Sequence, residues 1–241
     1  MTGNPLTIAV VIPALNEAGN IRSLVQDVRR VVPAQVIVVD NGSTDATAAE
    51  AAAGGAVVVG EPRRGYGYAC QAGVRQTGEL RADVVVFLDG DYSFLPAELP
   101  RLLLPILQGR AEMVLGSRWL GRIAPGAMPP QQRFGNWLAA RLMRWLYDMR
   151  VTDLGPYRAV RLSLLLSLDM QEMTYGWPAE MMVKAARRGA RIVETPVSYH
   201  ARRSGRSKVS GTLRGTLLAA RYILGVTLRY AFTDFDSSQE P

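Results

Sequence analysis

Short apolar runs alternate with helical segments in the first quarter of the chain, and this alternation constrains the fold most. Residues 7–12 and 36–39 are continuous apolar runs that predict buried strands. A helix is predicted after each of them, capped by Asn16 in the first case and by Asp45 in the second. Strand–helix–strand units this short pair in parallel through right-handed crossovers. The sequence therefore predicts an α/β fold with a Rossmann-like, mostly parallel sheet flanked by helices.

A later apolar run, residues 84–88, leads directly into two carboxylates, Asp89 and Asp91, with Gly90 between them. In doubly wound sheets, ligands bind beyond the carboxyl ends of the strands. Paired aspartates at that position suit a divalent cation that carries a phosphorylated ligand. Gly90 permits a turn tight enough for both carboxylates to face one ion. Because an Asp-Gly-Asp sequence is also a common turn, the motif alone leaves both interpretations open.

Two further acidic residues follow predicted strands: Glu17 follows the first and Asp40 the second. The carboxyl ends of parallel strands share one edge of the sheet, so these side chains and the two aspartates are expected to line one crevice. Carboxylates accept hydrogen bonds from ribose hydroxyls and base N–H groups, and they bind Mg²⁺ or Mn²⁺. Taken singly, Glu17 also suits the first turn of a helix and Asp40 a turn. Together they predict a nucleotide site.

The amino-acid composition limits the kinds of catalytic site and of binding partner to be expected. The 241 residues include one cysteine, Cys70, and one histidine, His200, which excludes an intramolecular disulfide and argues against a catalytic triad or a His-rich zinc site. The net charge of +7 indicates anionic partners: nucleic acid, phosphorylated substrates or an anionic membrane surface. The N-terminus has no basic segment, and Pro13 interrupts its apolar stretch, so we expect no signal peptide and a cytoplasmic location.

The C-terminal part combines a basic cluster with an apolar helix. The segment 121–130, with three prolines and two glycines, is expected to be a loop. The last helix, predicted over 211–232, carries three arginines on one face, which favours a position in a membrane interface over a membrane crossing. Packing on the protein itself is the alternative. We expect a catalytic domain over 1–210 and an amphipathic, candidate membrane-interfacial helix with a polar tail over 211–241.

The ordered motifs resemble those of a known family. The segments VVIPALNE, VIVVDNGSTD, RRGYGYACQAG, FLDGD, GSR and RRSGRSK, in that order, resemble the inverting family-two glycosyltransferases of GT-A fold. Within that family the chain is most similar to the dolichyl- and polyprenyl-phosphate sugar synthases, and the resemblance covers residues 7–210. The run 153–158 differs from the more usual Thr-Ser-Gly-Phe-Arg of the family, which concerns the acceptor side.

The resemblance implies a role for each matching residue. By that resemblance the nucleoside would contact Pro13, Leu15, Glu17 and Asp40. The ribose, diphosphate and metal would contact Asp89 and Asp91, and the diphosphate would also contact Arg203. The acceptor phosphate would contact Arg118 and Arg133. Departure of a nucleoside diphosphate develops negative charge, which a metal with Arg203 or Lys208 can stabilise.

The acceptor decides whether a base is needed. A phosphate acceptor is already anionic at neutral pH, so its attack on the anomeric carbon needs positioning and no strong base. Arg118 and Arg133 supply positioning through charged hydrogen bonds. An alcohol acceptor would require a carboxylate base, for which Asp153 and Glu180 are the candidates.

These inferences lead to one expected function and several alternatives. We expect a Mg²⁺- or Mn²⁺-dependent inverting hexosyltransferase that moves a sugar from a GDP-mannose or UDP-glucose type donor to a polyprenyl or dolichyl monophosphate. It would act as a peripheral protein at the cytoplasmic membrane face. The first alternative is the same donor chemistry with a soluble alcohol or carboxylate-bearing acceptor. A basic nucleic-acid-binding module and a nucleotidyltransferase are the others, but the chain lacks a recognition helix and a Gly-rich, Lys-bearing N-terminal loop, so we expect no nucleic-acid partner.

Overall fold

The computed structural model describes residues 6–204 and 213–232, with the backbone alone between 213 and 220. Its strands are β1 Ile8–Ala14, β2 Ala34–Asp40, β3 Val57–Gly60, β4 Val84–Phe87, β5 Met113–Ile123, β6 Arg158–Arg161 and β7 Ile192–Tyr199. Its helices are α1 Ala18–Val31, α2 Thr47–Ala53, α3 Tyr66–Glu79, α4 Leu99–Leu107, α5 Pro130–Tyr147, α6 Leu162–Ser167, α7 Trp177–Arg187 and α8 Leu213–Phe232, with a 3-10 turn at Pro96–Glu98.

The strands form one seven-stranded sheet in the order β3-β2-β1-β4-β6-β5-β7. β1, β2, β3 and β4 pair in parallel, as does β5 with β7, whereas β6 runs antiparallel to both of its neighbours. The predicted α/β fold with a mostly parallel sheet is confirmed, and the first four strands follow the short strand–helix–strand units read from the sequence.

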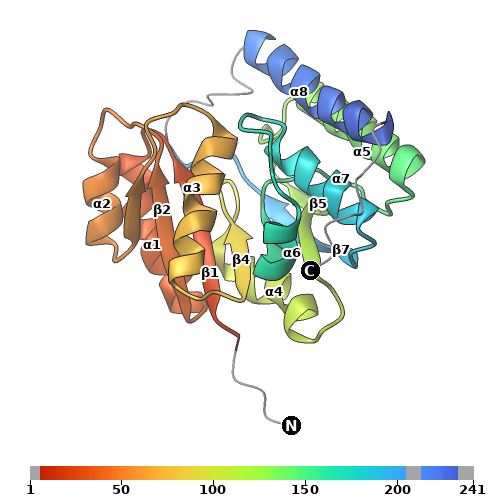
Figure 1. The fold of residues 1–241 in the computed structure, drawn as a ribbon. Helices are drawn as coiled ribbons and strands as arrows, with labels where there is room; N and C mark the ends of the chain where they lie inside the picture. Colours follow the sequence, from red (N-terminus) through yellow and green to blue (C-terminus); the bar gives the residue numbers. More distant parts are fainter. Residues whose placement is uncertain (1–5, 205–212, 233–241) are drawn as a thin grey trace.

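The central strands are apolar at nearly every position because both faces of the sheet are covered. In β1, Val10 and Ile12 face one side and Ala9 and Val11 face the other, since side chains alternate along a strand. α1 and α4 pack on the first side, and α3 and α7 pack on the second (Figure 1). Side chains that could bind a ligand therefore lie at the strand ends and in the loops that follow them.

The strand β5 extends into the segment 121–130, which was expected to be a loop. Residues 121–123 were expected to begin a loop, but they continue β5 and pair with the end of β7 after a register shift. A Cβ atom on Gly121 would lie 2.0 Å from the carbonyl oxygen of Val197. Gly121 is therefore required by the close approach of the two strands, and the expectation of a loop at these three residues was wrong.

The last helix packs on the protein. α8 lies against α5 and α7 (Figure 1), with Val226 and Thr227 buried and the Tyr230 hydroxyl donating a hydrogen bond of 2.7 Å to Glu180. Tyr222 and Leu228 are among its exposed residues. No helix within the described ranges has both the length and the apolar character needed to cross a membrane.

Candidate active site

Three carboxylates follow strands that are adjacent in the sheet. Glu17 follows β1, Asp40 ends β2 and Asp89 follows β4. The register aligns the last residue of β1 with Asp40, so these parallel strands end at one edge, as expected. A Cβ atom on Gly90 would lie 3.5 Å from Cγ of Glu17. The Asp-Gly-Asp turn therefore packs directly against Glu17.

Arg202 connects two of the acidic residues. Its guanidinium donates a hydrogen bond of 3.0 Å to Oε1 of Glu17, and it lies 2.7 Å from Oδ2 of Asp91. Glu17 and Asp91 are both buried, and Arg202 is largely so. The arginine arrives from the segment after β7, so residues 185 positions apart in the chain meet here.

Arg203, the arginine that sequence similarity assigned to the diphosphate, is directed elsewhere. Its backbone N–H donates to the carbonyl of Asp91 at 3.1 Å, and its guanidinium lies 5.0 Å from the centre of the Tyr92 ring. The chain bends at residues 203–204, directly after Arg202, and the two guanidiniums have different partners. The basic motif RRSGRSK includes Arg202, but the sequence does not distinguish it from Arg203. Lys208 lies outside the described residues.

The paired aspartates have the properties of a cation site. Burial, and next the nearby carboxylate of Asp91, raise the pKa of Asp89 to about 7, although Arg202 and Arg118 act in the opposite direction. Two crowded carboxylates that arginine only partly neutralises suit a hard divalent cation with oxygen ligands. Among the described residues no cluster of three or more acidic, His or Cys side chains could hold such an ion. Two carboxylates supply only part of the ligand set of such an ion, and the phosphate oxygens of a bound ligand are of the type that would complete it.

The turn after β2 is tied to the loop 61–65. Asp40 accepts a hydrogen bond of 2.9 Å from the Ser43 N–H. The side-chain amide of Asn41 donates to the carbonyls of Glu61 and Arg63 at 2.9 and 2.7 Å, and its oxygen accepts from the Gly65 N–H at 3.0 Å. Asn41 thus holds a Gly-containing loop at the edge where the carboxylates lie. Pro13 and Leu15, predicted nucleoside contacts, are half-buried at the end of β1.

The two arginines predicted for the acceptor phosphate have different surroundings. Arg118 is buried against Asp153. The Asp153 carboxylate accepts hydrogen bonds from the Nε and the backbone N–H of Arg118, each at 2.7 Å, and from its Nη2 at 2.6 Å. Its guanidinium lies 5.1 Å from the centre of the Tyr199 ring. Arg133 is exposed, donates to the carbonyl of Met128 at 3.3 Å, and lies over Trp119.

The two candidate bases are both buried in ion pairs. Asp153 is fully buried and is bound to Arg118. Glu180 is fully buried and lies 2.8 Å from Nζ of Lys184, and it also accepts hydrogen bonds from the backbone N–H groups of residues 171 and 172. Both carboxylates therefore have structural partners in this structure.

Arg158 was given no role from the sequence, yet it is a fully buried cation beside the site. It donates to the carbonyls of Pro178 and Gly155 at 2.8 and 2.6 Å, while its Nε has no partner among the described residues. Burial lowers its pKa to about 10, and the nearby Tyr66 and Asp89 are among the groups that oppose this shift. The available signal was that Arg158 matches the final arginine of the family's usual Thr-Ser-Gly-Phe-Arg, although the rest of the run 153–158 differs from it.

Comparisons with known proteins identify the family of the chain. The model of glycosyl transferase family 2 matches residues 9–166. An uncharacterized glycosyltransferase of Mycobacterium bovis is 38% identical over 221 residues, which cover 91% of this chain and 96% of that protein. An undecaprenyl-phosphate mannosyltransferase of Micrococcus luteus is 33% identical over 224 residues, covering 87% of this chain and 90% of that protein.

A solved structure is similar over almost the whole chain. Glucosyl-3-phosphoglycerate synthase of Mycobacterium tuberculosis, in complex with Mn²⁺, UDP and phosphoglyceric acid, superposes with a TM-score of 0.75 at 26% identity, covering 96% of this chain and 80% of that one. The same enzyme has been solved with Mg²⁺ and UDP. These matches confirm the resemblance read from the sequence motifs. The chain belongs to glycosyl transferase family 2 and is a hexose-transferring enzyme of GT-A fold.

Proposed function

We propose that this enzyme transfers a hexose from a nucleotide sugar to a polyprenyl monophosphate. The observation that carries the choice of acceptor is the state of the two candidate bases, since Asp153 and Glu180 are both buried in ion pairs. An alcohol acceptor needs a base within reach of its proton. A phosphate acceptor is an anion already and needs only to be positioned.

On the donor side, Asp40 and Glu17 bind the nucleoside, with Pro13 and Leu15 beside them. Asp89 and Asp91 hold a Mg²⁺ or Mn²⁺ ion, which neutralises charge on the departing diphosphate when bound. We assign the second positive charge to Arg202, because it already lies 2.7 Å from Asp91. A preorganised cation at the place where negative charge develops stabilises the transition state.

On the acceptor side, the phosphate is received by Arg133 with Arg118 behind it. Arg133 is exposed, and among the described residues no carboxylate pairs with it. Arg118 is held rigidly by Asp153, and it is close enough to lower the pKa of Asp89. A fixed guanidinium near Asp89 supports an acceptor phosphate that is held beside the donor carboxylates. The similarity to the undecaprenyl-phosphate mannosyltransferase supports the same acceptor class.

A second candidate is a soluble acceptor that carries a carboxylate and a phosphate. It is favoured by the solved glucosyl-3-phosphoglycerate synthase, which was crystallised with phosphoglyceric acid. The donor chemistry would be unchanged, and the same arginines would receive the acceptor's phosphate.

The test is transfer of labelled hexose from GDP-mannose and UDP-glucose to a short-chain polyprenyl monophosphate, with the corresponding prenyl alcohol as the matched control. We expect lipid-extractable product from the phosphate alone, a requirement for Mg²⁺ or Mn²⁺, and loss of product in Asp91→Ala with the fold intact. Arg133→Ala should weaken use of the acceptor, whereas Glu180→Gln, if it folds, should not. Transfer to the alcohol, or no transfer to the phosphate with either donor, would contradict the proposal.

A further inference from the structure

We propose that the exposed face of α5, together with the adjoining end of β5, is a docking surface for an anionic lipid bilayer. The α5 face consists of Phe134, Trp137, Arg141, Arg144 and Trp145. Their spacings of three and four residues place them on one side of the helix. The opposite side carries the buried residues of α5, which are Asn136, Ala139, Ala140 and Met143.

Three aromatic side chains of this face are more than half exposed to solvent. Trp145 is 79% exposed, Phe134 63% and Trp137 51%. Trp119 of β5, which is 40% exposed, continues the patch, since Arg133 of α5 lies over its ring. A contiguous apolar patch of this kind marks an interaction site, and tryptophan is enriched where proteins meet the membrane–water interface.

Arginines are interleaved with these aromatic residues. Arg133 lies over the ring of Trp119 at 5.9 Å and Arg141 over that of Trp137 at 6.0 Å. Arg144 and Arg150 are exposed nearby. Among the described residues, none of these four arginines forms an ion pair with a carboxylate. The patch is therefore both aromatic and cationic, which matches the headgroup layer of an anionic membrane.

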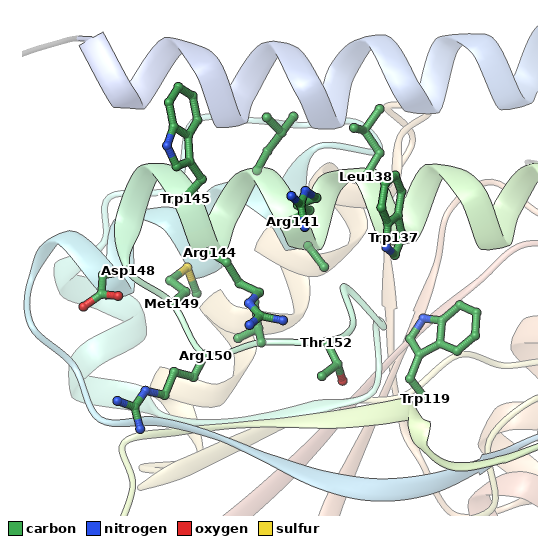
Figure 2. A pocket seen from close by; sticks show the side chains of 13 residues that line it. Trp119, Trp137, Leu138, Arg141, Arg144, Trp145, Asp148, Met149, Arg150 and Thr152 are labelled. Carbon is green, nitrogen blue, oxygen red and sulfur yellow. The ribbon is translucent and has the colours of Figure 1, made fainter.

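A cavity of about 890 Å³ opens between α5 and the segment 148–152. Figure 2 shows Trp119 and Trp137 approaching one another at one end of it and Arg144 pointing into it from α5. Its walls combine aromatic rings with arginine guanidiniums, which are the side chains suited to the headgroup layer of an anionic bilayer.

The surface adjoins the catalytic edge. Thr152 lines the cavity, and the next residue, Asp153, holds Arg118 by a bidentate ion pair. A bilayer on the α5 face would therefore present lipid headgroups beside the proposed acceptor side. The biological meaning of this docking surface rests on the proposed lipid acceptor. The expected membrane contact then lies on α5 and not on α8. A second copy of the chain is a poorer occupant, since symmetric pairing would bring these arginines together.

The experiment is sedimentation of the full chain with phosphatidylcholine vesicles and with vesicles that also contain phosphatidylglycerol. One variant combines Trp137→Ser with Trp145→Ser, and another combines Arg141→Glu with Arg144→Glu. The matched control combines Leu107→Ser with Arg110→Glu, both at exposed positions at and just after the end of α4, at the opposite end of the molecule in Figure 1. We expect the wild type and the control to bind the anionic vesicles, and each α5 variant to bind about tenfold more weakly or worse.

A second readout separates this inference from the proposed function. Transfer to a short-chain polyprenyl phosphate in detergent requires no bilayer, so the α5 variants should retain it. Absence of vesicle binding by the wild type, or equal binding by the α5 variants, overturns the docking surface even when transfer in detergent proceeds. A change of oligomeric state or of duplex DNA binding in these variants, without a change in vesicle binding, also overturns it. Vesicle binding that depends on the α5 face, without transfer to any polyprenyl phosphate, supports docking and refutes the proposed acceptor.

Discussion

The guanidinium of Arg202 lies 2.7 Å from Oδ2 of Asp91, the second carboxylate of the Asp-Gly-Asp turn. The same guanidinium hydrogen-bonds to Glu17 after β1. One cation from the C-terminal part of the chain thus joins two strand ends of the parallel half-sheet. In the proposed function this guanidinium is the positive charge beside the departing nucleoside diphosphate, and these contacts distinguish Arg202 from its neighbour.

The single variants Arg202→Ala and Arg203→Ala should therefore differ in their effect on kcat. Arg202→Ala should lower kcat by about 100-fold or more, as expected when a preorganised charge at the leaving group is removed. Arg203→Ala should change kcat only slightly, because the Arg203 guanidinium lies over Tyr92. Steady-state transfer kinetics measure both, with thermal melts to confirm folding. A larger loss in Arg203→Ala would contradict the assignment.

Removal of the Asp153 carboxylate should destabilise the fold. Asp153→Ala leaves Arg118 buried without its partner, and breaking a buried ion pair from one side costs about 3–5 kcal/mol. The double variant Arg118→Met with Asp153→Leu should recover much of that loss, since no unpaired charge remains. Urea unfolding measures the free energies. Equal destabilisation in the single and double variants would show that packing, and not charge, holds this region.

Glu61 makes part of the stability depend on pH. Its hydrogen-bonded ion pair with Arg63, opposed by burial, lowers the pKa of Glu61 from near 4.5 to about 2. The folded state therefore binds this proton more weakly than the unfolded state, so its contribution is fully present above about pH 4.5 and lost as the pH falls toward 2. Glu61→Gln should be less stable than the wild type at about pH 6, with the difference shrinking toward about pH 3. A difference that is independent of pH over this range would refute the ion pair's role.

Two glycines should respond oppositely to alanine. Gly121→Ala would place a Cβ atom 2.0 Å from the Val197 carbonyl oxygen and should destabilise the protein by about 1–3 kcal/mol. Gly135 lies within α5, and a Cβ atom there meets nothing within 4 Å. Gly135→Ala should therefore stabilise the helix by about 0.5–1 kcal/mol. Thermal melts of the two variants suffice, and stabilisation by Gly121→Ala would contradict the strand pairing described here.

The fold was largely predictable from the sequence because its signals are local. Apolar runs such as 84–87 predict strands directly, and the acidic residues that follow them could be placed on one edge from parallel pairing alone. Residues 121–123 were expected to lie in a loop because they begin a segment with three prolines and two glycines, and only the close approach to Val197 explains Gly121 within β5.

Site features that depend on tertiary contacts were less predictable. The Arg118–Asp153 pair joins residues 35 positions apart, and neither residue's neighbours in sequence indicate the other. The orientations of Arg202 and Arg203 are set by the path of the chain after β7. The buried position of Arg158 follows from the antiparallel pairing of β6 with β4, for which the sequence carries no local signal.

The choice of acceptor is the central claim, and competition in one reaction tests it most directly. The purified enzyme would receive labelled nucleotide sugar, a divalent cation, and equal concentrations of short-chain polyprenyl monophosphate and 3-phosphoglycerate. The products would then be separated by organic extraction and identified by mass. We predict label in the organic phase as polyprenyl-phosphohexose. Label that stays in the aqueous phase as a hexosyl-phosphoglycerate would contradict the account.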